Sequence, residues 1–183
     1  MIIYGDIQWP MVSAIAASTG VIVALVFYTL NLRSTRLSNS ARMVLDLLQT
    51  FNSDEMRGCR RSFATRLLDK NSPVDVRRDV PVLEFFEQVG YLTRRKVLDE
   101  GMVWNCFFWS LELYFLAVTR DPNLIATARE ENKSPSLFQE IEWLYSRLCK
   151  VDMKEESAVE HIPPHSDYVR LFLEEESKLK VQV

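Results

Sequence analysis

A long uncharged segment near the N-terminus constrains the fold of this chain more than any other feature. No Asp, Glu, Lys or Arg occurs between Val12 and Leu32. A helix of about 20 apolar residues matches a bilayer core of roughly 30 Å. The acidic leader, and the AIAAS motif that precedes the most apolar part, argue against a cleaved signal peptide. The sequence therefore predicts a transmembrane helix over 12–32, with a short external N-terminus at 1–11.

Charged residues flank this segment asymmetrically. Asp6 precedes it, whereas Arg33, Arg36 and Arg42 follow it. Because positive charge is enriched on the cytoplasmic side of membrane helices, we expect an external N-terminus and a cytoplasmic C-terminal domain. The three cysteines show no metal-ligand spacing, as is typical of reduced thiols in the cytosol.

The rest of the chain has the apolar periodicity of helices. No Pro or Gly lies between Gly20 and Gly58, so the first helix is expected to continue through 33–52 as a juxtamembrane extension. Further helical patterns are separated by polar, proline-containing loops. Ser53 is the expected N-cap of the second helix, and Pro81 and Pro135 are the expected starts of two later helices. The predicted fold is all-α, with one N-terminal transmembrane helix continuing into a cytosolic helical bundle. We expect the cytosolic helical domain at 53–150, and a polar segment with a C-terminal helix at 151–183.

The segment 101–120 is apolar enough to raise the question of a second membrane span. It contains Glu112 near its middle and Asn105 one turn from its start, and Asp99 and Glu100 precede it. Ionisable residues are costly at the centre of a bilayer. We therefore expect a buried, aromatic-rich helix of the cytosolic domain.

Signatures of enzymatic chemistry are missing from the sequence. The five glycines are isolated from one another and form no phosphate-binding loop. His161 and His165 lie in the motif HIPPH, whose prolines predict a loop rather than a metal-binding helix face. We predict no enzyme, no catalytic residue, no metal ligand and no cofactor.

Charge is distributed unevenly along the chain. Residues 33–96 carry 13 Lys and Arg against 8 Asp and Glu, whereas residues 97–183 carry 9 against 16. The net charges of +5 and −7 favour an anionic partner near the membrane side. Attraction between the two halves, within or between subunits, explains the same asymmetry.

Two basic clusters are candidates for contacts with an anionic ligand. Guanidinium groups bind phosphates through two nitrogens, and aromatic rings stack on bases. The alternatives are ion pairs with the acidic half or contacts with lipid headgroups for the first cluster, and the preference of cations for a helix C-terminus for the second. The candidate residues are Arg57, Arg60 and Arg61 on one helix face, and Arg94, Arg95 and Lys96 at the end of the next helix.

One face of the predicted transmembrane helix has a heptad-like pattern of small, aromatic and polar residues. Small residues let helices pack closely in lipid, so the pattern predicts a homo-oligomer. Around a central axis, Phe27 would form a hydrophobic constriction and Asn31 a polar inner mouth. A packed bundle without a pore, or a plain anchor, remains open. The candidate pore-lining residues are Ser13, Ala17, Gly20, Ala24, Phe27, Asn31 and Ser34.

Three segments resemble a bacterial family of single-pass membrane proteins that is catalogued mainly as a domain of unknown function. They are VLEFFEQVGYLTRRKVLDEG, VWNCFFWSLELYFLAV and SPSLFQEIEWLYSRL. The resemblance covers most of residues 10–150 and rests on hydrophobic texture. Within this family, the chain resembles the channel effector subunit of Hailong-type anti-phage defence.

This resemblance implies a function for the chain. A partner nucleotidyltransferase would make a nucleotide or single-stranded DNA signal that controls an oligomeric ion channel, such as a tetramer, in the bacterial inner membrane. We therefore expect a gated pore effector that halts growth of the infected cell. The alternative is a membrane-tethered helical interaction module whose span acts only as an anchor.

Overall fold

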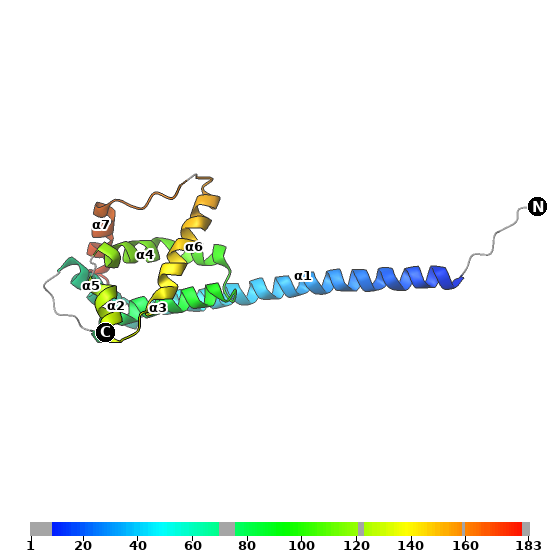
Figure 1. The fold of residues 1–183 in the computed structure, drawn as a ribbon, viewed down its shortest axis with the longest axis horizontal. Helices are drawn as coiled ribbons and strands as arrows, with labels where there is room; N and C mark the ends of the chain where they lie inside the picture. The colour runs from blue at the N-terminus through cyan, green and yellow to red at the C-terminus, as the bar shows by residue number, and fades with distance from the viewer. Residues whose placement is uncertain (1–8, 70–75, 121–122, 159, 181–183) are drawn as a thin grey trace, which may run out of the picture. The chain divides into compact units, whose positions relative to one another are not determined.

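The computed structural model describes residues 9–69, 76–120, 123–158 and 160–180, and within these ranges the side chains of 9–20, 76–79, 120, 123, 127 and 131 are not described. The chain divides into two compact units, Met1–Asn39 and Ser40–Val183. Helix α1 (Trp9–Phe51) contributes residues to both units. The second unit also holds α2 (Asp54–Leu68), α3 (Val76–Arg94), α4 (Glu100–Arg120), α5 (Asn123–Glu131), α6 (Gln139–Glu155) and α7 (Ser166–Glu176) (Figure 1). The described elements are all helices, which confirms the all-α prediction.

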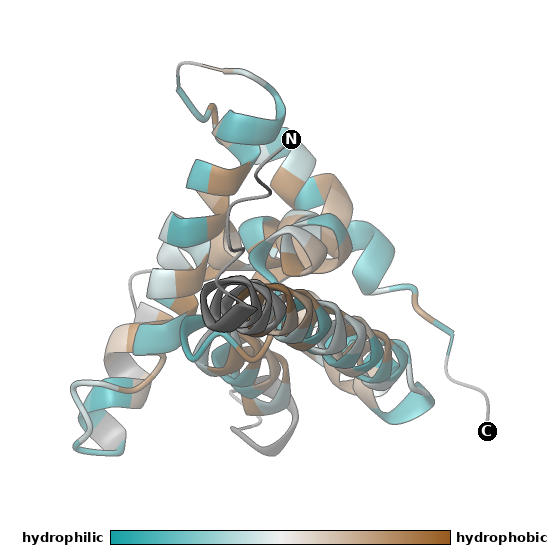
Figure 2. Ribbon diagram, turned by 90° about the vertical axis from the view of Figure 1, so that its right-hand side faces the viewer, coloured by the Kyte–Doolittle hydropathy of each residue, from teal (hydrophilic) through white to brown (hydrophobic). Residues whose placement is uncertain are grey.

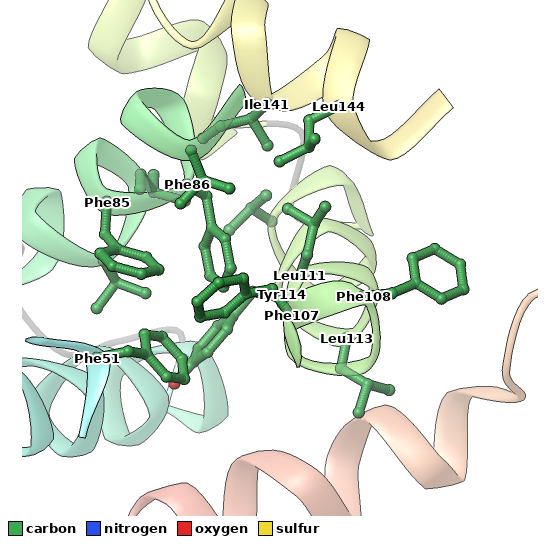
Figure 3. Packing of buried hydrophobic residues seen from close by; sticks show 14 of the residues in the cluster. Phe51, Phe85, Phe86, Phe107, Phe108, Leu111, Leu113, Tyr114, Ile141 and Leu144 are labelled. Atoms are coloured by element: carbon green, nitrogen blue, oxygen red, sulfur yellow. The ribbon is translucent and has the colours of Figure 1, made fainter. Parts of the chain in front are cut away.

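Helix α4 forms the centre of the core of the second unit. Its Phe107, Leu111 and Tyr114 are almost completely buried. Figure 3 shows them beside Phe86 of α3 and Leu144 of α6. Among the described residues α4 is the helix long and apolar enough to cross a membrane, but half of that stretch is buried inside the protein. The expectation of a buried aromatic helix is thus confirmed by its packing.

The end of α1 belongs to the core of the second unit. Val44, Leu47 and Phe51 are buried, at the three- and four-residue spacing of one helix face. The Phe51 ring lies 5.0 Å from the Phe85 ring, centroid to centroid, and 6.1 Å from the Phe107 ring. The juxtamembrane extension expected at 33–52 therefore contains a packed part, which begins at Ser40.

The helices of the second unit are amphipathic. In Figure 2 hydrophilic and hydrophobic residues alternate along their ribbons. Helix α6 buries Ile141, Leu144 and Leu148, while Glu142, Ser146 and Arg147 are exposed. Burial of one face explains why the apolar periodicity located these helices correctly.

Several helix boundaries differ from the sequence-based expectation. Ser53 is the N-cap of α2 as predicted, since its Oγ accepts a hydrogen bond from Met56 N at 3.2 Å. Helix α3 begins at Val76 instead of Pro81, so Pro81 lies inside the helix, five positions after its first residue. Helix α6 begins at Gln139 instead of close to Pro135. Phe138 precedes it with a left-handed φ of 61°, which places the ring in the core and prevents an earlier helix start.

Helices α3 and α6 approach each other closely at Gly90. A Cβ atom at this position would lie 2.5 Å from the backbone oxygen of Glu140. One turn earlier on α3, Glu87 Oε2 accepts a hydrogen bond from Ile141 N at 2.9 Å and so caps the first turn of α6. Burial raises the pKa of Glu87, although the backbone donors partly offset this effect.

Candidate functional site

Between Val21 and Leu32 the first unit presents an uncharged, apolar helical surface. Every residue of α1 from Val21 to Asn39 is exposed, and the first charged one is Arg33. Between Val21 and Leu32 the large apolar side chains are 41–70% exposed. An apolar surface of this extent marks an interaction with a membrane or with another protein. The residues are Val21, Ile22, Val23, Leu25, Val26, Phe27, Tyr28, Leu30 and Leu32.

Four of the predicted pore-lining residues have described side chains, and they share one face of α1. Ala24, Phe27, Asn31 and Ser34 follow one another at three- and four-residue intervals on α1, and all are exposed. Among the large apolar residues of this helix whose side chains are described, Phe27 is the most exposed, at 70%. The other three candidates belong to the α1 backbone, but their side chains lie outside the described residues: Ser13, Ala17 and Gly20.

Two threonine hydroxyl groups in this helix are bonded to its own backbone. Thr29 Oγ1 donates to the backbone oxygen of Val26 at 2.8 Å, and Thr35 Oγ1 donates to that of Asn31 at 2.9 Å. A hydroxyl bonded within its own helix needs no water, which removes much of the cost of placing it in hydrocarbon.

The structure places Arg60, the central residue of the first basic cluster, in a buried ion pair. Its Nε donates to Glu176 Oε2 at 2.7 Å, and its Nη1 donates to the backbone oxygen of Phe51 at 3.1 Å. Its guanidinium carbon also lies 4.1 Å from the centroid of the Phe51 ring. Tyr114 completes the network by donating its hydroxyl to Glu176 Oε2 at 2.6 Å. Arg60 therefore joins α2 to α7 and is not available to a ligand.

The pKa values in this network follow from burial and charge. Burial by itself lowers the pKa of Arg60, but the hydrogen bonds and the charge of Glu176 more than offset it, so the pKa is raised. Burial and then the charge of Glu176 raise the pKa of Tyr114 well above its ordinary value. The tyrosine thus stays protonated and remains a donor.

The other two residues of the first cluster are more accessible. Arg57 is half-buried and Arg61 is exposed, one helical turn apart on α2. Neither forms an ion pair with the described residues. Together they leave two cationic groups facing the same way.

The second cluster ends α3 and is divided by the fold. Arg94 Nη1 pairs with Glu140 Oε1 at 2.9 Å, and its guanidinium lies 5.9 Å from the Trp143 ring. Arg95 is exposed and lies over the Tyr91 ring at 5.4 Å. Lys96, also exposed, has a φ of 58°, which ends the helix. Arg94 is thus neutralised by Glu140, whereas Arg95 and Lys96 are exposed and available to a ligand.

A polar cluster that sequence reasoning missed lies between α4, α6 and the segment before α7. His161 contacts two carboxylates, with Nδ1 2.8 Å from Asp152 Oδ2 and Nε2 2.6 Å from Glu112 Oε1. Trp104 Nε1 donates to Asp152 Oδ1 at 3.0 Å. Tyr145 lies at the edge of the cluster, with its hydroxyl 3.4 Å from Glu112 Oε1. The motif HIPPH predicted a loop but carried no signal for these partners.

Protonation of this cluster is set by burial and by the two carboxylates. Burial lowers the pKa of His161, but the hydrogen bonds and charges of Glu112 and Asp152 raise it by more, so the net shift is upward. Burial raises the pKa of Glu112, and His161 offsets part of that increase. A doubly protonated imidazole that donates to both carboxylates is the arrangement these contacts favour.

The described residues contain no group of three or more His, Cys, Asp or Glu side chains arranged to hold a metal ion. A pocket of about 780 Å³ lies beside the end of α4 and α5, where Val118 and Ile125 contribute apolar walls. Arg129 lines it but already pairs with Glu142 at 3.0 Å. The charge of Arg129 is therefore already neutralised and is not available to a ligand in the pocket.

Comparison with known proteins identifies the family of the chain. No curated protein and no solved structure is significantly similar to it. One family model, described as "Domain of unknown function (DUF4760)", matches residues 14–148, which is well over half of the sequence. The match includes α1 from residue 14 onward and most of the helical core. The chain therefore belongs to the DUF4760 family.

Proposed function

We propose that this protein is a membrane effector whose α1 helix crosses the bacterial inner membrane. The observation that carries the proposal is the exposed surface from Val21 to Leu32, in which no described residue is charged or buried. The helical stretch from Trp9 to Leu32 is also uncharged, and at about 1.5 Å per residue it is long enough for a hydrocarbon core of roughly 30 Å. A bilayer covers such a surface without any partner protein.

The flanking charges set the orientation in this proposal. Asp6 precedes the uncharged stretch, while Arg33 and Arg36 follow it and are exposed. The N-terminus is then outside and the unit from Ser40 onward is in the cytoplasm.

In this proposal copies of the chain assemble through α1 into a gated ion-conducting pore, in a tetramer or a related oligomer. Small residues such as Ala24 support close helix packing in lipid, and Phe27 and Asn31 lie on the same exposed face. Phe27 is assigned to the hydrophobic constriction, and Asn31 and Ser34 to the polar cytoplasmic mouth. We assign this pore to anti-phage defence, on the resemblance of the sequence to channel effectors of the Hailong type.

The controlling signal in this proposal is an anionic nucleotide or single-stranded DNA made by a partner nucleotidyltransferase. Arg57 and Arg61 are its proposed contacts, because they share a helix face and form no ion pair with the described residues. Arg60 and Arg94 are left out, since Glu176 and Glu140 already neutralise them. Signal binding at α2 would act on α1 through the core around Phe51, whose backbone oxygen accepts from Arg60.

Ion flux from liposomes that contain the purified full chain tests this function. Flux that responds to short single-stranded DNA, and that rises in a Phe27→Ala variant because the constriction is removed, supports a gated pore. Tyr28→Ala, at an exposed aromatic neighbour outside the predicted pore-lining face, is the matched control and should leave flux unchanged. No flux from inserted, oligomeric protein would favour the interaction module with a simple anchor.

A further inference from the structure

The connection between α3 and α4 carries exposed cations that the proposed signal contacts do not use. Arg95 and Lys96 are exposed in this connection, and Arg42 is exposed on α1. None of the three forms an ion pair with the described residues. We call Arg95 and Lys96, with Tyr91 and Val97, the basic turn.

The basic turn is held firmly against α1. Asp99 N donates to Ser40 Oγ at 2.6 Å, and Ser40 is only 5% exposed. Leu98 is buried in the core, and Val97 N donates to Leu92 O at 3.0 Å. These contacts fix the basic turn beside Ser40 of α1, two positions before Arg42.

The surroundings of the cations are apolar and aromatic rather than acidic. Tyr91 is 48% exposed and Val97 is 45% exposed. Of the acids that follow the basic turn in sequence, Asp99 accepts from Met102 N at 3.1 Å and Glu100 pairs with Arg147 at 2.7 Å. Exposed cations mixed with an aromatic ring and an aliphatic side chain are typical of surfaces at the lipid headgroup level.

The chain itself limits how far the basic turn lies from the uncharged segment. Ser40 lies eight positions after Leu32, so the distance between them is at most about 29 Å in any conformation and roughly 12 Å in a helix. A bilayer that holds the uncharged segment therefore keeps Ser40, and the basic turn bonded beside it, close to its surface.

We propose that the basic turn binds the phosphate headgroups of anionic lipids in the cytoplasmic leaflet. This inference rests on the proposed membrane insertion of α1. Arg95 and Lys96 supply the charge, and Tyr91 and Val97 contact the headgroup and upper acyl region. The lipid then holds the α3–α4 connection, and with it Ser40, at the membrane surface.

Lipid binding to the full chain in an uncharged detergent tests the proposal. Native mass spectrometry would compare short-chain phosphatidylglycerol, which is anionic, with phosphatidylcholine, which has no net charge. Each surface cation is worth about a fivefold change in affinity, so the double variant Arg95→Gln/Lys96→Gln should bind phosphatidylglycerol roughly 25-fold more weakly. Binding of phosphatidylcholine should not change. The control Lys178→Gln/Lys180→Gln removes the same charge from exposed positions at the end of the chain and should bind phosphatidylglycerol like the wild type.

Each other outcome has a distinct meaning. Release of the full chain from cell membranes by alkaline extraction would refute membrane insertion, and with it the proposed function. A chain that stays in the membrane, but whose Arg95→Gln/Lys96→Gln variant binds phosphatidylglycerol as tightly as the wild type, would refute the lipid site alone. If that variant instead loses binding of a short single-stranded thymidine oligonucleotide and keeps lipid binding, the basic turn is a nucleic-acid contact and the lipid proposal is wrong.

Discussion

Arg60 and Glu176 form a bidentate ion pair across 116 residues of sequence. Both Nε and Nη2 of the arginine donate to the carboxylate, with Nε 2.7 Å from Oε2, and each side chain is less than a tenth exposed. The pair joins the middle of α2 to the last turn of α7, and Tyr114 of α4 donates to the same carboxylate. One buried carboxylate thus connects three helices.

Removal of this carboxylate should strongly destabilise the protein. Glu176→Ala leaves Arg60 buried without a counter-charge, which typically costs about 3–5 kcal/mol. Thermal unfolding of the full chain in detergent should show the melting temperature falling by roughly 2–4 °C for each kcal/mol lost. Glu175→Ala, at the exposed neighbouring position, is the control and should change the melting temperature little. Equal stability of the two variants would mean that the ion pair contributes nothing.

Gly90 should not tolerate a side chain. The Cβ of Gly90→Ala would lie 2.5 Å from the Glu140 backbone oxygen and 2.9 Å from its carbonyl carbon, so α3 and α6 would have to separate. Overpacking of this kind costs about 1–3 kcal/mol, although alanine normally favours a helix over glycine. Chemical denaturation of the full chain would measure the loss. The matched control is Gly101→Ala on α4, whose nearest contact is a movable carboxylate oxygen at 3.3 Å, and it should stay within about 1 kcal/mol of the wild type.

Stability should fall as the pH rises through the titration of His161. Its folded-state pKa is raised above 6.5, so the native protein binds the proton more tightly than the unfolded chain does. The stabilisation is complete below about pH 6.5 and is lost as the pH passes the folded-state value. The raised pKa of Glu112 acts in the same direction at lower pH, because its native state also holds a proton more tightly.

Unfolding measured as a function of pH in His161→Gln would test this assignment. The variant should be less stable than the wild type at pH 6, and it should lose the decline above pH 6.5. His165→Gln changes an exposed histidine and should keep the decline. If the stability of His161→Gln declined with pH as steeply as that of the wild type, the titrating group would be another residue.

Cys149 should be a poor nucleophile at neutral pH. Burial is the main cause that raises the pKa of its thiol to about 11, with the nearby carboxylates of Glu112 and Asp152 adding to the increase. At pH 8 only about one thiol in a thousand is then ionised. Alkylation followed by mass spectrometry, in a Cys59→Ser/Cys106→Ser background, should show a rate that keeps increasing up to about pH 11. A rate that already levels off near pH 8.5 would show an ordinary thiol.

The sequence alone determined the helical character of the protein and the positions of most helices. Apolar spacing is a local property of the chain, so it located the buried faces of α4 and α6 and the continuation of α1 to Phe51. The Ser53 cap was also readable, because a cap bonds to a residue only three positions away. The prolines were less informative, since Pro81 lies inside α3 instead of at its start.

Only the tertiary structure decided which charges remain available. Arg57, Arg60 and Arg61 are equivalent in sequence, yet Arg60 is buried against a glutamate from the other end of the chain. Arg94 and Arg95 are adjacent, yet only the first faces Glu140. Local periodicity specifies the side of a helix on which a residue lies, whereas the partner on that side depends on how distant helices pack. The availability of a charge to an outside ligand is therefore a property of the fold, and no single segment encodes it.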